Sequence, residues 1–99
     1  MNAYVQRLTQ PKMLQAYKRL GLTYVGLFGS SAREEDEQMS DVDVLVDFSG
    51  KRSFFELADV MFLFQEAVEK KVDLVMKTRV KKQFLPFIER DLITLYEEN

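Results

Sequence analysis

Four segments of the chain combine apolar and polar residues in patterns that predict β-strands. In the clearest, residues 41–48, valines alternate with mainly acidic positions, so one face of the strand is apolar and the other carries aspartates. The other three segments are short and rich in β-branched and aromatic residues, as buried strands are. The predicted strands span residues 23–28, 41–48, 72–76 and, as a short last strand, 92–96.

Helical spacing of apolar residues predicts two helices around these strands. Pro11 fits the first turn of one helix, and Gly21 is a favourable residue to end it. Ser53 and Glu56 form a capping-box pattern, in which the side chain of each residue bonds the backbone of the other. This pattern predicts the start of a long helix that continues to about Lys70.

Residues 78–90 also predict helix, with Pro86 near the middle. Pro86 either begins a new helix after a short break or kinks one helix. With this segment, helices and strands alternate along most of the chain. That order predicts an α/β or α+β fold of two layers, a small mixed sheet with helices packed on it, in one domain over residues 1–99.

The long helix that begins near Ser53 carries apolar residues over a wider arc than one core face needs. Most of them cluster on one side, as a core face does, but Phe55 and Phe62 lie well away from that side. The commoner explanation is that the sheet covers enough of the helix to bury both. The alternative is that they form a surface for a partner protein or for a second copy of the chain.

The composition narrows the chemistry that the chain can perform. It has 99 residues without histidine or cysteine, which excludes a Ser-His-Asp triad, a thiolate nucleophile and zinc sites built from those residues. A net charge of -2 gives no sign of bulk binding to nucleic acid. The apolar runs are too short to span a membrane, and residues 1–10 are polar, without the apolar core of a signal peptide. We therefore expect a cytoplasmic protein with no membrane contact.

A Gly-Ser pair and an Asp-x-Asp pair, ten residues apart, carry the candidate chemistry. Gly29 and Ser30 follow a predicted strand, where glycine lets the backbone approach a ligand and exposed N–H groups favour an anion such as phosphate. Asp41 and Asp43 lie two residues apart on the next strand, so their carboxylates leave the same face. Two such carboxylates raise each other's pKa unless a cation lies between them. Mg²⁺ suits this position, because one or two carboxylates and substrate phosphates usually hold it.

A third carboxylate, Asp73, lies inside the apolar segment 72–76. A charged residue there is costly unless it reaches solvent, a partner or a metal ion. If this strand lies beside the strand of residues 41–48, Asp73 joins Asp41 and Asp43. Three carboxylates, two Mg²⁺ ions and a triphosphate then form a two-metal site for phosphoryl transfer. Asp73 is the expected base for the attacking hydroxyl, because the chain has no histidine.

Each of these features also has a purely structural interpretation. Aspartates on the wet face of a strand and Gly-Ser turns are both common, and Asp73 on an edge strand could simply face solvent. Only the joint pattern is rare. The basic run of residues 77–82 is most often a solvated helix face, although it could neutralise a triphosphate or meet an acidic partner. Arg33, just after the Gly-Ser turn, is a better placed candidate for phosphate binding.

The string LFGSSAR (residues 27–33), followed by SDVDVLVDF (residues 40–48), resembles the minimal nucleotidyltransferases of the polymerase-beta-like superfamily. The signature of that family is Gly-Ser, ten residues and Asp-x-Asp. The string KVDLV (residues 71–75) is similar to the family's third-carboxylate strand. The resemblance covers nearly the whole chain and implies the polymerase-beta-like nucleotidyltransferase fold.

The resemblance also implies ATP as substrate, Mg²⁺ as cofactor and a role for each motif residue. The family often carries glycine where this chain has Glu34, so the chain departs from the family pattern there. The implied roles are phosphate binding for Gly29 and Ser30 and metal binding for Asp41, Asp43 and Asp73.

Prokaryotic members of this family are typically encoded beside a HEPN-domain protein, as antitoxin and toxin. Some transfer AMP from ATP to a tyrosine of the HEPN partner. The resemblance therefore implies a HEPN-type toxin as partner. The net charge of -2 gives no reason to expect direct contact with nucleic acid. One alternative is an antitoxin with an inactive site that neutralises its partner by binding alone. Another is a transferase for a small molecule such as an aminoglycoside, which the short chain disfavours because a substrate pocket needs walls.

Overall fold

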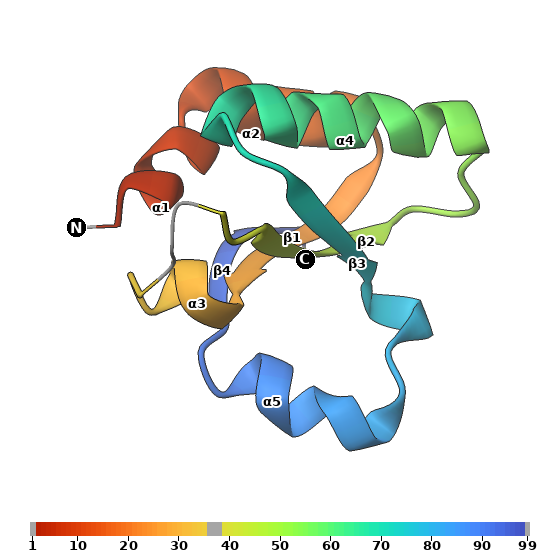
Figure 1. The fold of residues 1–99 in the computed structure, drawn as a ribbon. Helices are drawn as coiled ribbons and strands as arrows, with labels where there is room; N and C mark the ends of the chain where they lie inside the picture. The colour runs from red at the N-terminus through yellow and green to blue at the C-terminus, as the bar shows by residue number, and fades with distance from the viewer. Residues whose placement is uncertain (1, 36–38, 99) are drawn as a thin grey trace.

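The structure is a computed structural model that describes residues 2–35 and 39–98. Figure 1 shows how its helices and strands are arranged. The helices are α1 (Ala3–Leu8), α2 (Pro11–Arg19), α3 (Gly29–Ala32), α4 (Phe54–Val68) and α5 (Leu85–Glu89), with two 3-10 turns, η1 (Lys77–Arg79) and η2 (Lys82–Phe84). The strands are β1 (Leu22–Phe28), β2 (Val42–Phe48), β3 (Val72–Met76) and β4 (Ile93–Glu97).

The four strands form one mixed sheet in the order β3-β2-β1-β4. Strand β1 pairs antiparallel with β2 and with β4, whereas β2 and β3 are parallel. Parallel neighbours need a crossover connection, and α4 supplies it. The predicted strands are thus confirmed, and so is the predicted small mixed sheet with helices packed on it.

One face of the sheet packs against α1, α2 and α4, which lie together on one side of it in Figure 1. The valines of β2 share this face, as their alternation predicts, and are fully buried. Tyr17 of α2 is also fully buried and packs against Phe64 of α4. Its hydroxyl donates a hydrogen bond of 2.8 Å to the carbonyl oxygen of Leu8. This bond lets a tyrosine fill the core without leaving a buried polar group unsatisfied.

The short helix α5 covers part of the opposite face of the sheet. Ile88 of α5 packs there with Tyr24 of β1 and Leu45 of β2. Pro86 lies in the first turn of α5, so Pro86 begins a new helix after a break rather than kinking a long one. Successive strand residues alternate between faces, so Asp43 shares the α5 side of the sheet with Leu45.

Helix α1 is an element that the sequence patterns do not predict, because residues 1–10 are polar overall. It begins after Asn2, whose side-chain Oδ1 accepts hydrogen bonds from the N–H groups of Tyr4 at 2.8 Å and Val5 at 3.3 Å. Its last residue, Leu8, is fully buried in the core. A side-chain cap and one deeply buried residue thus stabilise a helix too short to show a periodic pattern. No helix within the described residues is long and apolar enough to span a membrane.

Helix α4 begins at the predicted capping box. The N–H of Glu56 donates to Oγ of Ser53 at 3.2 Å, and the N–H of Ser53 donates to Oε1 of Glu56 at 3.0 Å. The buried side of the helix consists of Val60, Phe64 and Val68. These residues form one stripe, as expected for a helix that lies on a sheet.

The outer side of α4 exposes aromatic side chains. Phe55 and Phe62 are 80% and 71% exposed, so the interpretation that the sheet buries them is wrong. The physical reason is that a sheet contacts a helix along one stripe only, and these residues lie outside that stripe. Phe54, packed edge-on against Phe55, is exposed as well. We refer to Phe54, Phe55 and Phe62 as the α4 aromatic surface.

Candidate active site

Asp43 and Asp73 are direct partners in the parallel register of β2 and β3. Side chains paired in this way leave the same face of a sheet, here the face that α5 partly covers. The sequence predicts a joint site only if the strands of Asp43 and Asp73 are neighbours. The structure meets this condition, because β2 and β3 are paired. Asp41 comes immediately before the first residue of β2 and is exposed. The three carboxylates thus lie around the start of the two parallel strands.

The electrostatic surroundings of Asp43 are those of a crowded acidic site. Burial raises the pKa of the Asp43 carboxyl, and the negative charges of Asp73 and then Asp41 raise this pKa further. Both neighbouring aspartates therefore act on Asp43 in the direction that their spacing predicts. Burial and like charge disfavour the ionised form of Asp43, and a cation beside it would offset that penalty.

Gly29 follows β1 directly and lies against Asp43. Its φ is +72°, a conformation that residues with a side chain rarely adopt. A Cβ atom on Gly29 would overlap Oδ2 of Asp43. The register explains this closeness, because Phe28 is the sheet partner of Asp43 across β1 and β2. Glycine at this position therefore leaves the space that the Asp43 carboxylate occupies.

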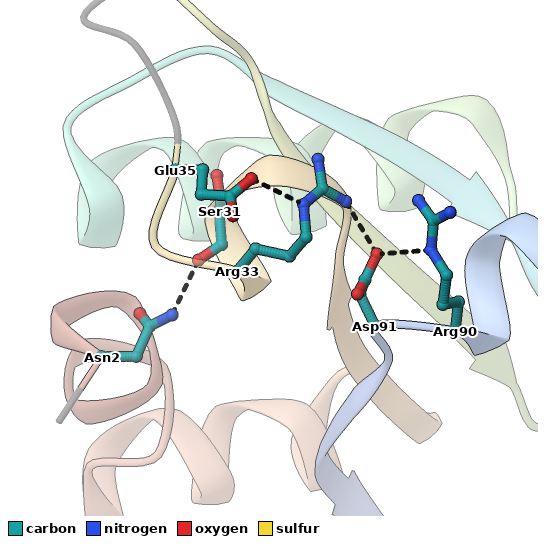
Figure 2. A network of polar contacts seen from close by, with 6 residues as sticks. All are labelled: Asn2, Ser31, Arg33, Glu35, Arg90 and Asp91. Atoms are coloured by element: carbon teal, nitrogen blue, oxygen red, sulfur yellow. Dashed lines mark hydrogen bonds and ion pairs between the residues drawn. The ribbon is translucent and has the colours of Figure 1, made fainter.

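Hydrogen bonds from near and distant residues hold the turn that follows Gly29. The carbonyl oxygen of Ser30 accepts a hydrogen bond of 2.9 Å from the N–H of Glu35. Ser31 is fully buried, and its carbonyl oxygen accepts a hydrogen bond of 2.7 Å from Nδ2 of Asn2 (Figure 2). Asn2 thus caps α1 and at the same time ties the start of the chain to α3. Gly29 and Ser30 are presented on an anchored turn.

Arg33, at the end of α3, is bound by two carboxylates. Its Nη1 donates to Oδ2 of Asp91 at 2.7 Å, and its Nε donates to Oε2 of Glu35 at 3.1 Å (Figure 2). Arg90 donates to the same oxygen of Asp91 at 3.3 Å. The hydrogen bond from Arg33 lowers the pKa of the Asp91 carboxyl, and the same bond raises the pKa of Arg33. The expected phosphate ligand therefore already has anionic partners.

Glu34 occupies a backbone conformation that favours glycine. Its φ is +60°, in the left-handed region, where a residue with a side chain is strained by about 1–2 kcal/mol. The resembling family often has glycine at this position, which would adopt the same backbone without strain. The N–H of Glu34 still donates to the carbonyl oxygen of Ser31, at 3.4 Å. The departure from the family pattern thus introduces local strain while the turn stays hydrogen-bonded.

The donor set fits a hard cation, because carboxylate oxygens are the protein ligands that Mg²⁺ prefers. Across residues 2–35 and 39–98, no three acidic side chains gather closely enough to hold a metal ion by themselves. Mg²⁺ is usually held by one or two carboxylates together with substrate phosphates rather than by a cage of protein ligands. The residues present therefore fit a cation that a bound nucleotide helps to hold.

A separate hollow of about 500 Å³ lies among α1, α2 and α4. Arg7, Arg19, Leu63 and Glu66 are among the residues that line it, and none of the candidate site residues does. The hollow therefore lies on the helix-covered side of the molecule, away from the carboxylates, and is separate from the candidate site.

The structure brings most of the predicted site residues to one end of the sheet. Gly29 contacts Asp43, and Asp73 is the register partner of Asp43. Ser30 lies in the same turn as Gly29. Sequence reasoning missed two residues that hold this turn, Asn2 and Asp91, because neither belongs to a motif. The available signals were weak: an asparagine at a helix start, and an acidic residue just before the last predicted strand.

A family model described as "Polymerase beta, Nucleotidyltransferase" matches residues 12–99. The chain belongs to the polymerase beta-type nucleotidyltransferase family. The protein adenylyltransferase MntA of Thermococcus cleftensis is 33% identical to this nucleotidyltransferase over 76 residues, which make up 77% of each chain. The family and the general activity that the motifs predict, nucleotidyl transfer, are confirmed.

Solved structures share the fold of this nucleotidyltransferase. A structure described as that of a minimal nucleotidyltransferase is 27% identical, with a TM-score of 0.75 over 94% of this chain and 95% of that chain. A second match belongs to a complex of a tri-AMPylated Shewanella oneidensis HEPN toxin with an MNT antitoxin. It is 18% identical, with a TM-score of 0.64 over 94% of this chain and 73% of that chain. The low identity of the second match indicates a shared fold alone.

Proposed function

We propose that this nucleotidyltransferase transfers AMP from ATP to a tyrosine hydroxyl of a HEPN-type toxin and thereby acts as an antitoxin. The observation that carries the proposal is the position of Asp43, in register with Asp73 on one side and against Gly29 on the other. Carboxylates suited to a cation and a glycine turn suited to a phosphate thus share one end of the sheet. The names of the relatives, protein adenylyltransferase and MNT antitoxin, support the choice of donor and acceptor.

Each site residue has a role in the proposed reaction. The acceptor oxygen forms a bond to the α-phosphorus of ATP, and the bond to the bridging oxygen breaks, so pyrophosphate leaves with that electron pair. Asp73 takes the proton of the hydroxyl, because the chain has no histidine for this task. The N–H groups of Gly29 and Ser30 and the Ser30 hydroxyl bind the phosphates. Arg33 contributes a guanidinium that Asp91 holds in position.

Asp41, Asp43 and Asp73 would hold two Mg²⁺ ions together with the triphosphate. The ions, when bound, neutralise charge on the phosphates and on the departing pyrophosphate. The contribution of the chain is to keep three carboxylates near one another despite their repulsion, which contributes to the raised pKa of Asp43. Protons compete with the metal for Asp43, so metal affinity should fall as the solution becomes more acidic.

The α4 aromatic surface is the proposed docking surface for the toxin. Its three phenylalanines are exposed, and Asp59 and Glu66 occupy exposed positions on the same helix. We therefore expect the toxin to present apolar groups surrounded by basic residues, since complementary charge favours the correct partner. A second copy of this chain would bring the same acidic residues and be repelled. Because α4 and the carboxylates lie on opposite faces of the sheet, the acceptor tyrosine should belong to an extended segment that passes the edge strand β3.

Transfer of label from ATP to the partner tests the function. The assay incubates a purified HEPN-type toxin with the nucleotidyltransferase, labelled ATP and Mg²⁺. Wild type should label it, and Asp43→Asn should label it at least about a hundredfold more slowly, since losing a metal ligand removes several kcal/mol of transition-state stabilisation. Asp47→Asn, the same change four residues along β2, is the control and should retain the activity. No transfer by folded wild type, or equal transfer by Asp43→Asn, would contradict the proposal.

The rival function is an antitoxin that neutralises its partner by contact alone. It is favoured by the finding that, in the described part of the chain, no three carboxylates are close enough to hold a metal unaided. Protection of cells that express the toxin distinguishes the two. The enzyme account predicts that Asp43→Asn loses protection although it still binds the toxin. The binding account predicts that this variant protects as well as wild type.

A further inference from the structure

The ion pair between Arg33 and Asp91 joins two connections that the sheet brings together. Strands β1 and β4 are antiparallel, with Leu27 opposite Ile93, so the end of β1 lies beside the start of β4. The turn that follows β1 therefore lies beside the residues that precede β4. On its other side the same turn lies against Asp43 of β2. The proposed phosphate turn is thus flanked by Asp43 of β2 on one side and by Asp91, which precedes β4, on the other.

The pair between Arg33 and Asp91 is short and partly shielded from water. The N···O distance is 2.7 Å, and the Asp91 and Arg33 side chains are 16% and 34% exposed. Charge-assisted bonds of this length are stronger than neutral ones, and partial burial reduces screening. Glu35 on Arg33 and Arg90 on Asp91 complete a network of two acidic and two basic side chains (Figure 2). The formal charges of the four side chains cancel, so the network adds no net negative charge beside an incoming triphosphate.

We propose that Asp91 is a positioning residue for triphosphate binding, which acts through Arg33 to hold the turn of Gly29 and Ser30 in place. This inference rests on the proposed function, because it takes that turn to be the phosphate site. Asp91 itself touches no substrate. Without Asp91, the Arg33 side chain and the end of α3 gain freedom, and ATP must order them when it binds. The loss should therefore appear as weaker nucleotide binding.

The opposite role for Asp91 makes the opposite prediction. If Asp91 withheld Arg33 from the phosphates, Asp91→Asn would release the guanidinium and MgATP would bind more tightly. A positioning residue predicts weaker binding in the same variant. The sign of the change in MgATP affinity therefore separates the two roles.

Two measurements on the full chain test the proposal: the Kd of MgATP, and hydrogen exchange of the amides of residues 33–35 without nucleotide. Asp91→Asn should raise the Kd about three- to tenfold, as expected for loss of a partly shielded ion pair. Asp91→Glu should restore part of the affinity. In an Arg33→Gln background, Asp91→Asn should change the Kd no further, because Asp91 acts through Arg33. Asp47→Asn, the same chemical change on β2, is the control and should leave the Kd unchanged.

Hydrogen exchange tests, without ATP, whether Asp91 stabilises the turn that follows Gly29. The amides of Arg33, Glu34 and Glu35 donate to carbonyl oxygens within the turn, so they should exchange faster in Asp91→Asn than in the control variant Asp47→Asn. Unchanged exchange, or MgATP binding that is equal or tighter in Asp91→Asn, overturns the proposal. If wild type binds no MgATP, the proposed function fails and the positioning role fails with it. The exchange rates then still show whether Asp91 holds the turn.

Discussion

Asp43 is the sheet partner of Asp73, and the charge of Asp73 is one cause of the raised pKa of Asp43. Two carboxylates side by side on neighbouring strands destabilise the folded chain when both are ionised. Evolved chains keep such an arrangement mainly where a ligand or reaction uses it. The relationship therefore connects the stability of this nucleotidyltransferase to its chemistry, and stability measurements can test it.

Replacement of Asp43 by asparagine should stabilise the protein in the absence of Mg²⁺. Because the pKa of Asp43 is higher in the folded than in the unfolded chain, the folded state binds this proton more tightly. Ionisation of Asp43 therefore lowers the free energy of unfolding as the pH rises through the folded-state pKa. Asp43→Asn cannot ionise, so its free energy of unfolding should exceed that of wild type at neutral pH. The difference should shrink below the unfolded-state pKa. Urea denaturation at neutral and acidic pH measures both values, and a lower midpoint for Asp43→Asn at neutral pH would contradict the account.

Gly29 and Gly50 offer a matched pair of substitutions. Both have a φ near +75°, at +72° and +78°, but a Cβ on Gly29 meets Asp43 whereas a Cβ on Gly50 meets nothing within 4 Å. Alanine at either position should cost about 1–2 kcal/mol of stability through backbone strain. Only Gly29→Ala displaces the Asp43 carboxylate, so only this variant should lose AMP transfer. Transfer of labelled AMP measures the activity of both variants. Equal activity would mean that Gly29 has no role in the active site.

Replacement of Glu34 by glycine should relieve strain without loss of function. Glycine adopts the φ of +60° freely, although it adds entropy to the unfolded chain. We expect the free energy of unfolding to rise by up to about 1 kcal/mol and AMP transfer to stay within about twofold of wild type. Thermal unfolding and the transfer assay measure the two quantities. A large fall in activity would mean that the Glu34 carboxylate takes part in the reaction.

The α4 aromatic surface should be needed for the complex and not for the fold. Alanine at both Phe55 and Phe62 removes two exposed rings, 80% and 71% accessible, and should abolish binding to the HEPN-type partner while the monomer stays folded. Phe87→Ala, which removes a ring 66% exposed on α5, is the control and should bind normally. Size-exclusion chromatography of mixtures reports the complex, and circular dichroism reports the fold. Undiminished binding by the double variant would place the interface elsewhere.

Short-range chemistry explains why much of this fold and site is predictable from the sequence. The alternation of valine and aspartate in residues 42–48 fixes which face is buried, and Ser53 with Glu56 fixes where α4 begins. The juxtaposition of Asp43 and Asp73 needs only that their strands be neighbours. Three further expectations stay predictions. They are the single domain over residues 1–99, the cytoplasmic location, and the roles of the site residues Gly29, Ser30, Arg33, Asp41, Asp43 and Asp73.

Long-range contacts explain what the sequence does not predict. Asn2 bonds Ser31, which is 29 residues further along the chain, and Asp91 bonds Arg33, which is 58 residues earlier. No local sequence pattern encodes such distant contacts. The exposure of Phe55 and Phe62 depends on how far the sheet extends around α4, which helical periodicity cannot show. The hydrogen-bond partners of Arg33 likewise appear only once β1 and β4 are paired.

The mass of the co-expressed HEPN-type partner tests the central claim most directly. The partner is purified after expression alone, with wild type, and with an Asp41→Asn/Asp43→Asn variant, and its intact mass is measured. The account predicts additions of whole AMP units with wild type only, located on tyrosine by peptide fragmentation. A partner that is bound and neutralised by wild type but carries no AMP, or that carries equal AMP with the variant, would contradict it.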